Sequence, residues 1–185
     1  MSLLRGEGIA LVRGGRLLFE GLGFGLEPAG ALHVTGPNGS GKSSLIRLAA
    51  GLLRASAGRV ESSAKVALAD EHLALDRERA LGRALAFWNG GTSPADAMEA
   101  MGIGHLADVP VRLLSTGQAR KARLARVIAT GAPLWLLDEP LNGLDAEGTQ
   151  RLANAIADHR AAGGAVLATS HQPLGDGWQR LELGQ

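Results

Sequence analysis

The sequence contains no cysteine and no tyrosine, and aromatic side chains account for only 3% of its 185 residues. The lack of cysteine excludes disulfide bridges and thiolate zinc sites, and it is the usual composition of a protein from a reducing compartment. An excess of charge is also missing, because 19 basic and 18 acidic residues leave a formal net charge of +1. This balance gives no general indication of binding to nucleic acid or to an anionic membrane surface.

Long hydrophobic runs are missing as well. The N-terminal segment is interrupted by Arg5, Glu7, Arg13 and Arg16, so it lacks the apolar core of a secretion signal. The most apolar segments elsewhere are broken by arginine before they reach the roughly 18 to 20 residues that a membrane-spanning helix needs. We therefore expect a cytoplasmic protein, and any work at a membrane would require another chain to cross the bilayer.

The chain does contain enough apolar residues, 45% of the total, to form one core, which predicts a single domain over residues 1–185. Short apolar runs cover residues 31–34, 133–137 and 165–169, and each has the length and continuous hydrophobicity of a strand buried on both faces of a parallel sheet. Each run leads directly into polar residues. Because ligands bind at the carboxyl ends of strands in open α/β sheets, the sequence predicts an α/β fold with its site at that edge.

Smaller elements are expected around this sheet. Two consecutive glycines between short alternating stretches near the N-terminus predict an antiparallel β lobe. After the first apolar run, Leu45, Leu48 and Leu52 lie at helical spacing, and the alanine-rich region from Asp76 to Ala107 predicts two or three short helices. We assign a small helical lobe to about residues 72–130.

The first apolar run is followed by a loop that matches the phosphate-binding pattern G-x-x-x-x-G-K-[ST] between a strand and a helix. Its backbone N–H groups are expected to surround phosphate oxygens, its lysine to reach the β and γ phosphates, and its serine to bind Mg²⁺. An ordinary glycine-rich turn is the alternative, and the flanking strand and helix argue against it. The predicted ligands are Gly36, Pro37, Asn38, Gly39, Ser40, Gly41, Lys42, Ser43 and the following Ser44.

The second apolar run ends in an acidic pair, Asp138 and Glu139, that has no packing reason to follow a buried strand. We predict that Asp138 holds Mg²⁺ through a water molecule. Glu139 is predicted to orient and polarise the water that attacks the γ-phosphate. Capping of the following turn is the structural alternative for this pair.

The third apolar run leads to His171, at a position from which a histidine can reach a γ-phosphate and the water beside it. A lone histidine is more often structural, but the convergence of three strand ends favours a functional role. His33 lies within the first run, and we expect it to be a packed or edge residue.

A second feature typical of anion binding lies at residues 113–129, LLSTGQARKARLARVIA, where a Ser-Thr-Gly turn opens a helix. A chain with one phosphate loop has no obvious need for it. The helix also carries Arg120, Lys121, Arg123 and Arg126, and we expect most of these to form a solvated face rather than ligands.

These motifs together resemble the nucleotide-binding subunits of ATP-binding-cassette (ABC) transporters. The resemblance rests on GPNGSGKSS, LSTGQ at 114–118, LWLLDEP, GLD at 143–145 and SHQ at 170–172, in this order and spacing, over roughly residues 17–172. Within the family, the chain most resembles the ATP-binding export subunits of haem exporters in cytochrome c biogenesis. The short chain, the small non-glycine residue inside LSTGQ and the continuation SHQPL carry this finer resemblance.

The resemblance implies a P-loop ATPase with a mainly parallel sheet flanked by helices, an N-terminal antiparallel β lobe and a small helical lobe. It implies a homodimer around ATP and Mg²⁺, in which Ser115, Gly117 and Asp145 of one subunit contact the ATP of the other, as the positive end of a helix allows. It also implies ATP hydrolysis that powers export through integral membrane permease subunits of the CcmB and CcmC type. Such a protein is peripheral on the cytoplasmic face of the inner membrane, and no nucleic acid partner is expected.

Three departures from the family pattern are visible. No glutamine occurs between residues 44 and 117, where the family usually has one that senses Mg²⁺, and Glu71 is expected to take its place. In the absence of tyrosine, Arg13 is expected to stack on adenine, and Phe19 is assigned to the core. Thr116 replaces a glycine, which predicts a right-handed or extended backbone at that position.

Two other functions stay open at this point. One is an ABC-type ATPase that acts as a mechanical switch without a permease, although such relatives generally carry two cassettes or long coiled coils, and neither fits in 185 residues. The other is a nucleotide-binding adaptor with little turnover, which the missing glutamine suggests.

Overall fold

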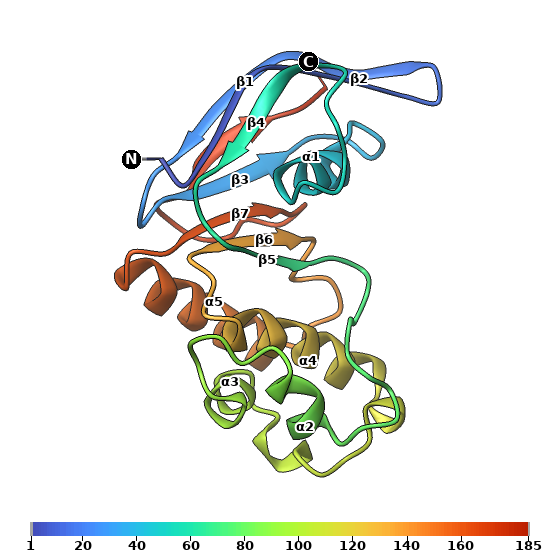
Figure 1. Cartoon of the computed structure of the whole chain (residues 1–185), viewed down its shortest axis with the longest axis vertical. Helices are drawn as coiled ribbons and strands as arrows, with labels where there is room; N and C mark the ends of the chain where they lie inside the picture. Colours follow the sequence, from blue (N-terminus) through green and yellow to red (C-terminus); the bar gives the residue numbers. More distant parts are fainter. Residues whose placement is uncertain (1, 185) are drawn as a thin grey trace.

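The computed structural model describes residues 2–184, so residues 1 and 185 of the predicted domain lie outside the described part. Its antiparallel sheet, at the top of Figure 1, has the strand order β2-β1-β4. Gly14 and Gly15 connect the first two strands with φ values of 57° and 75°, as a tight two-residue hairpin turn requires. The predicted β lobe is therefore confirmed, and its strands are β1 (Leu4–Arg13), β2 (Arg16–Leu26) and β4 (Ala57–Ser62).

The second sheet is parallel throughout and has the strand order β5-β6-β7-β3-β8. The three predicted strands are confirmed to within one residue as β3, β6 and β7, which occupy neighbouring positions in the sheet. Two strands that were not predicted, β5 and β8, form its edges. The bounds are β3 (Ala31–Thr35), β5 (Val66–Ala69), β6 (Leu134–Asp138), β7 (Ala165–Thr169) and β8 (Gln179–Glu182).

Alternate side chains of the central strands enter two different cores, which explains why the predicted runs are continuously hydrophobic. Leu136 and Leu167 pack on one face with the antiparallel sheet and α1 (Lys42–Ala49). Leu137 and Val166 pack on the other face, against the helices that include α5 (Ala146–Ala161). Helix α1 is shorter than predicted because Gly51 adopts a positive φ of 72°, and Leu52 is consequently 66% exposed.

The helical lobe lies between β5 and β6 in the chain and at the bottom of Figure 1. The predicted short helices are present, because the region from Asp76 to Ala107 contains two α-helices and one single-turn 3₁₀ helix. In residues 2–184 no helix is both long enough and apolar enough to cross a bilayer. The elements of the lobe are α2 (Leu81–Ala86), α3 (Pro94–Ala100), η1 (Gly104–Leu106), η2 (Val111–Leu113) and α4 (Thr116–Ala129).

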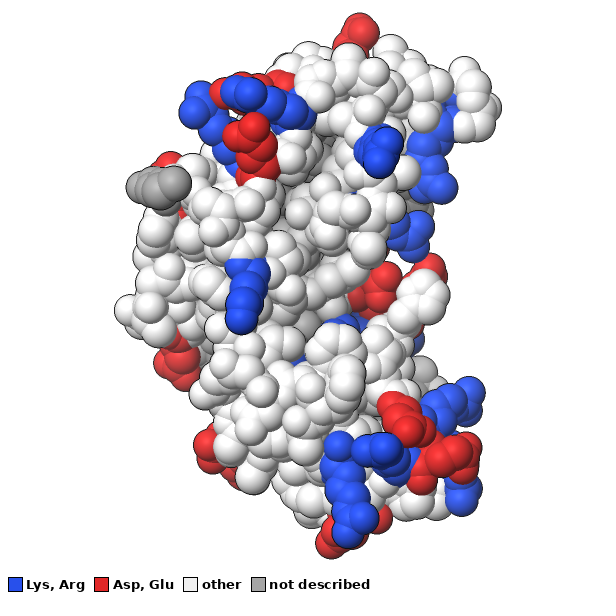
Figure 2. All heavy atoms as spheres, viewed as in Figure 1, with Lys and Arg blue, Asp and Glu red and all other residues white. Residues whose placement is uncertain are grey.

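The basic residues of α4 correct one prediction. Arg123 and Arg126 are buried, and their guanidinium groups donate to the backbone carbonyl groups of Asp70 and Leu68. Leu68 belongs to the edge strand β5 and Asp70 follows it directly, so their outward carbonyl groups lack a strand partner, and the two arginines supply one. A solvated face was therefore the wrong expectation for both. Elsewhere, Figure 2 shows most of the acidic and basic side chains near the margins of the visible face, with both signs side by side at its upper left and lower right, and a largely uncharged centre.

Candidate ATP-binding and hydrolysis site

The phosphate loop, residues 36–43, connects β3 directly to α1. Gly36 has a φ of 143°, and a Cβ atom there would lie 2.5 Å from the carbonyl oxygen of Leu183, so only glycine suits this position. The Nζ atom of Lys42 donates to the carbonyl oxygens of Gly36 (2.9 Å) and Pro37 (3.2 Å). The loop therefore curls around its own lysine at the N-terminus of α1, where backbone N–H groups favour anions.

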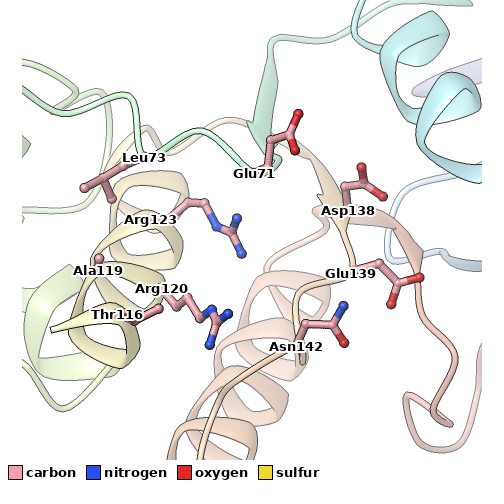
Figure 3. A pocket seen from close by; sticks show the side chains of 9 residues that line it. All are labelled: Glu71, Leu73, Thr116, Ala119, Arg120, Arg123, Asp138, Glu139 and Asn142. Carbon is pink, nitrogen blue, oxygen red and sulfur yellow. The ribbon is translucent and has the colours of Figure 1, made fainter.

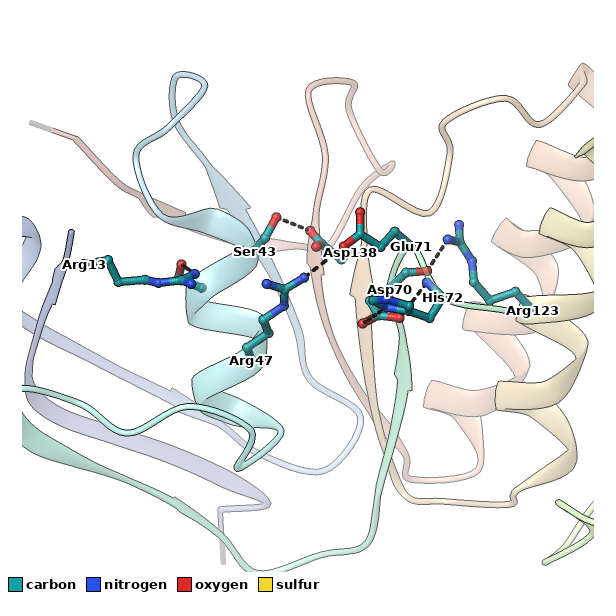
Figure 4. A network of polar contacts seen from close by, with 9 residues as sticks. Arg13, Ser43, Arg47, Asp70, Glu71, His72, Arg123 and Asp138 are labelled. Atoms are coloured by element: carbon teal, nitrogen blue, oxygen red, sulfur yellow. Dashed lines mark hydrogen bonds and ion pairs between the residues drawn. The ribbon is translucent and has the colours of Figure 1, made fainter. Parts of the chain in front are cut away.

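Asp138 ends β6, and two hydroxyl groups hold its carboxylate. The Oγ atom of Ser43 donates to Oδ1 of Asp138 over 3.1 Å (Figure 4), and Oγ1 of Thr169 donates to the same oxygen over 2.8 Å. Thr169 ends β7 and stands opposite Asp138 in the strand register. The structure thus brings the two predicted Mg²⁺ ligands, Ser43 and Asp138, into contact through oxygen atoms, the donors that Mg²⁺ prefers.

Glu139 follows β6 in a left-handed conformation with φ of 47°, which is uncommon for a residue that has a Cβ atom. Its N–H donates to Oγ1 of Thr169 over 2.9 Å. Its Oε1 atom lies 3.4 Å from Nε2 of His171, the residue that follows Ser170 after β7. The segments after β3, β6 and β7 therefore meet at one edge of the sheet, where their polar side chains are in contact.

Two cavities adjoin this edge. The first, which we name the phosphate cleft, measures about 650 Å³. It is lined by Arg13 and His171 and by five residues of the phosphate loop: Asn38, Gly39, Gly41, Lys42 and Ser43. The second, which we name the α4 cleft, measures about 460 Å³ and lies between α4 and the acidic pair (Figure 3). Glu139 and Asn142 line both cavities, so the acidic residue predicted to act on water stands between them.

Glu71 lies just beyond β5 and lines the α4 cleft on the same side of α4 as Asp138 (Figure 3). Its Oε1 atom forms an ion pair of 3.2 Å with Nη2 of Arg47 on α1, drawn in Figure 4. Next to it, burial would raise the pKa of Asp70, but hydrogen bonds from the backbone and ring of His72 outweigh this effect and keep that pKa below its ordinary value. The Glu71 carboxylate thus has a basic partner of its own, Arg47.

Ser115 caps α4 in a reciprocal arrangement. Its Oγ atom accepts from the N–H of Gln118 (3.2 Å), and the Gln118 side chain accepts from the N–H of Ser115 (2.9 Å). Thr116 is the first helical residue, which confirms the predicted right-handed backbone. A Cβ atom at Gly117 would meet no atom within 4 Å, so packing inside the chain does not require glycine there.

Within the chain, the turn at 115–117 and the phosphate loop do not meet. Thr116 lines the α4 cleft, which no residue of the phosphate loop lines, and the phosphate cleft contains no residue of this turn. Asp145 caps α5, where it accepts from the N–H of Gly148 (2.7 Å) and pairs with Lys121 (3.1 Å). These two hydrogen bonds, the one from Gly148 first, lower the pKa of Asp145. Asp145 therefore has a structural role inside its own chain, as the cap of α5, in addition to the role predicted for it.

The remaining predicted residues are also located. Arg13 lines the phosphate cleft and its Nη1 atom lies 3.4 Å from Oγ of Ser44. Phe19 is buried in the core, as expected. His33 is confirmed as a packed residue, and its Nε2 atom is 2.9 Å from the carbonyl oxygen of Ser170. Ser40, within the loop, is buried and is not one of the residues that line the phosphate cleft.

Three residues of this site were not predicted from the sequence: Thr169, Asn142 and Arg47. Thr169 was visible as a polar residue that closes a buried strand, the same signal that identified Asp138. Asn142 lies between the acidic pair and GLD, where a turn was expected, and nothing in the local sequence marks it. Arg47 could not be predicted, because the sequence does not show that this helix residue pairs with Glu71, which lies 24 residues further along the chain.

The sequence profile of the ABC transporter family matches residues 19–142, more than half of the chain. The chain belongs to the ABC transporter family. A protein of Sphingopyxis alaskensis named cytochrome c biogenesis ATP-binding export protein CcmA is 58% identical, over 93% of this chain and 91% of its own length. A protein of the same name from Novosphingobium aromaticivorans is 53% identical, over 90% of this chain and 87% of its own length.

Solved structures agree with this membership at the level of the fold. A structure described as the ATP binding subunit of an ABC transporter superposes with a TM-score of 0.86 at 19% identity, over 98% of this chain and 86% of that chain. The predicted fold class and the predicted similarity to CcmA-type proteins are therefore confirmed. The chain is an ABC ATPase, and ATP is the nucleotide of its family.

Proposed function

We propose that this ABC ATPase hydrolyses ATP at the phosphate cleft to power export in cytochrome c biogenesis. The observation that carries the hydrolytic part is the continuous contact from Ser43 through Asp138, Thr169 and Glu139 to His171. It joins a phosphate-loop hydroxyl to two carboxylates and a histidine, which are groups that can hold Mg²⁺ and position the attacking water.

Mg²⁺ is the metal that this site would hold, with Ser43 and Asp138 as its protein partners. Both candidate ligand atoms, Oγ of Ser43 and Oδ1 of Asp138, are oxygens, and they lie 3.1 Å apart. Mg²⁺ is a hard cation that prefers oxygen ligands. When bound, Mg²⁺ neutralises charge on the phosphate oxygens. The MgATP complex would sit beside Lys42, whose ammonium group exchanges its contacts with loop carbonyl groups for phosphate oxygens.

Hydrolysis then depends on Glu139 and His171. We assign to Glu139 the orientation and polarisation of the attacking water, because its carboxylate borders both clefts. His171 would donate to the γ-phosphate and, through its 3.4 Å contact, keep the Glu139 carboxylate in place. We assign the adenine contact to Arg13, which lines the phosphate cleft, with its guanidinium stacked on the base. Glu71 replaces the usual glutamine, with Arg47 as the balancing charge.

Two copies of the chain would complete each site. Ser115 and Gly117 lie apart from the phosphate loop of their own chain, and Gly117 leaves open space at the start of α4. Both observations support contact with ATP held by a partner subunit, through the hydroxyl of Ser115 and the N–H groups of the helix start. Asp145, which caps α5, would lie in the same interface.

The export role follows from the relatives named CcmA. We infer that the dimer docks on integral membrane permease subunits of the CcmB and CcmC type, as a peripheral protein on the cytoplasmic face of the inner membrane. Closure on ATP and reopening after hydrolysis would drive haem export by the permease. The name of the relatives as export proteins favours this function over a switch that works without a permease.

A complementation experiment tests the proposal. The chain is expressed in a bacterium that lacks its own CcmA-type protein, and c-type cytochromes are measured by haem staining, alongside MgATP hydrolysis by the purified chain. We expect the unaltered chain to restore cytochromes and Lys42→Ala to abolish both restoration and hydrolysis. Hydrolysis without restoration would contradict the export role, and restoration by Lys42→Ala would contradict the need for ATP.

A further inference from the structure

Thr169 is a fully buried residue with a hydroxyl group that serves both members of the acidic pair. Its Oγ1 atom donates to Oδ1 of Asp138 over 2.8 Å and accepts from the N–H of Glu139 over 2.9 Å. A hydroxyl has one proton to donate, and here it goes to the carboxylate, so the oxygen is left to accept from the backbone. A single atom thus joins the carboxylate of Asp138 to the main chain of the next residue.

This double contact lies at a point where the backbone adopts an uncommon conformation. Glu139 adopts φ of 47°, a conformation that residues with a Cβ atom rarely adopt and that surrounding contacts have to enforce. In this conformation its N–H points to β7 and donates to the Thr169 hydroxyl, which fixes the direction in which the glutamate leaves the strand. That direction leads to His171, 3.4 Å from the carboxylate.

We propose that Thr169 is a positioning residue for hydrolysis, which orients Asp138 toward Ser43 and Glu139 toward His171. The inference rests on the proposed function of this site. Thr169 lines neither cleft, and it acts through its two hydrogen-bond partners, Asp138 and Glu139. Because the required group is the hydroxyl, serine should replace threonine, whereas valine, which has the same shape without the hydroxyl, should not.

The test compares Thr169→Val with Thr169→Ser in the full chain, by Mg²⁺ titration of the binding of a fluorescent ATP analogue and by steady-state hydrolysis. Groups that orient metal ligands typically contribute about 10- to 100-fold to metal affinity or activity, so we expect a loss of this size in Mg²⁺ affinity and kcat for valine. Analogue binding in EDTA and KM for ATP should change less than about threefold, and serine should restore kcat to within about threefold.

A matched control is Thr130→Val. Thr130 also uses its hydroxyl twice, donating to the carbonyl of Val127 (2.6 Å) and accepting from the N–H of Ala132 (3.2 Å), but it lines neither cleft. We expect Thr130→Val to lower the melting temperature without changing kcat or Mg²⁺ affinity. If Thr169→Val does not fold, Thr169→Ala removes the same hydroxyl with less crowding and serves in its place.

A wild-type Mg²⁺ affinity in the valine variant would overturn the proposal, and this readout is independent of whether the chain hydrolyses ATP. Equal losses in Thr130→Val and Thr169→Val would also overturn it, because they would reflect stability alone. A final comparison adds Thr169→Val to Glu139→Gln under single-turnover conditions. Since Thr169 acts partly through Glu139, its effect on the rate should shrink markedly in the glutamine background, and full additivity would contradict the proposed positioning.

Discussion

Replacement of Arg126 by methionine offers a direct test of how α4 is attached to the parallel sheet. Arg126 is 5% exposed, donates to the carbonyl of Leu68 on the edge strand β5, and lies 4.8 Å from the ring centre of Trp88. Methionine keeps an unbranched apolar stem of similar length but has no guanidinium group. The substitution therefore removes the hydrogen bond and the cation–π contact while it retains most of the packing.

The expected loss of stability combines three contributions. A hydrogen bond from a charged group contributes about 1.5–3 kcal/mol, and a partly desolvated cation–π contact about 0.5–2 kcal/mol. Burial opposes both, because it lowers the pKa of Arg126 and so disfavours the charged form. We therefore expect Arg126→Met to lower the free energy of unfolding by about 2–4 kcal/mol, which corresponds to about 4–15 °C in melting temperature for a chain of this length.

Urea unfolding followed by circular dichroism measures this loss, and Arg112→Met is the matched control. Arg112 forms an exposed ion pair of 3.1 Å with Glu78, a type of contact that contributes only about 0–1 kcal/mol. The two variants remove the same chemical group, so the difference between them reports the buried contacts. If Arg126→Met costs no more than Arg112→Met at an unchanged denaturant slope, the attachment of α4 through β5 is refuted.

Three further predictions concern the site and the core. Glu139→Gln should lower kcat by about 100-fold or more and leave ATP binding intact, so that an ATP-bound dimer accumulates in light scattering; unaltered turnover would exclude Glu139 as the key base. Gly117→Ala should raise stability by about 0.5–1 kcal/mol, because alanine favours the helix and meets no neighbour, and yet weaken ATP-dependent dimerisation; normal dimerisation would contradict contact with a partner's ATP. Burial lowers the pKa of His159, so its contribution to stability is complete above about pH 6.5 and is lost as the pH falls through the lowered value. His159→Phe should therefore lose less stability than the unaltered chain between about pH 7 and pH 5, as measured by urea unfolding at each pH, and equal losses would contradict burial of the neutral ring.

The central strands and the phosphate loop could be predicted because their sequences satisfy local physical requirements. A strand covered on both faces must be continuously apolar, and Leu134–Asp138 has this pattern whatever surrounds it. The edge strands have no such requirement. β8 is mostly exposed, and the four residues of β5 are too few to distinguish a strand from a turn, so neither was predicted.

The buried arginines of α4 were predicted to be solvated, and Thr169 was not predicted at all. Both outcomes have the same physical cause, which is the presence of backbone groups that the sheet itself leaves unpaired. The carbonyl of Leu68 lacks a strand partner because β5 is an edge, and the N–H of Glu139 lacks one because the chain turns left-handed after β6. Buried backbone groups of this kind must find side-chain partners, and Arg126 and Thr169 supply them. The charge pattern of a helix predicts that its arginines are solvated. The pattern does not show which strand lies at the edge of the sheet, and so it cannot show which carbonyl groups need an arginine as a partner. Strand order therefore has to be known before the basic residues of α4 can be interpreted, and it depends on pairings between segments more than 60 residues apart, such as Val66 with Leu134.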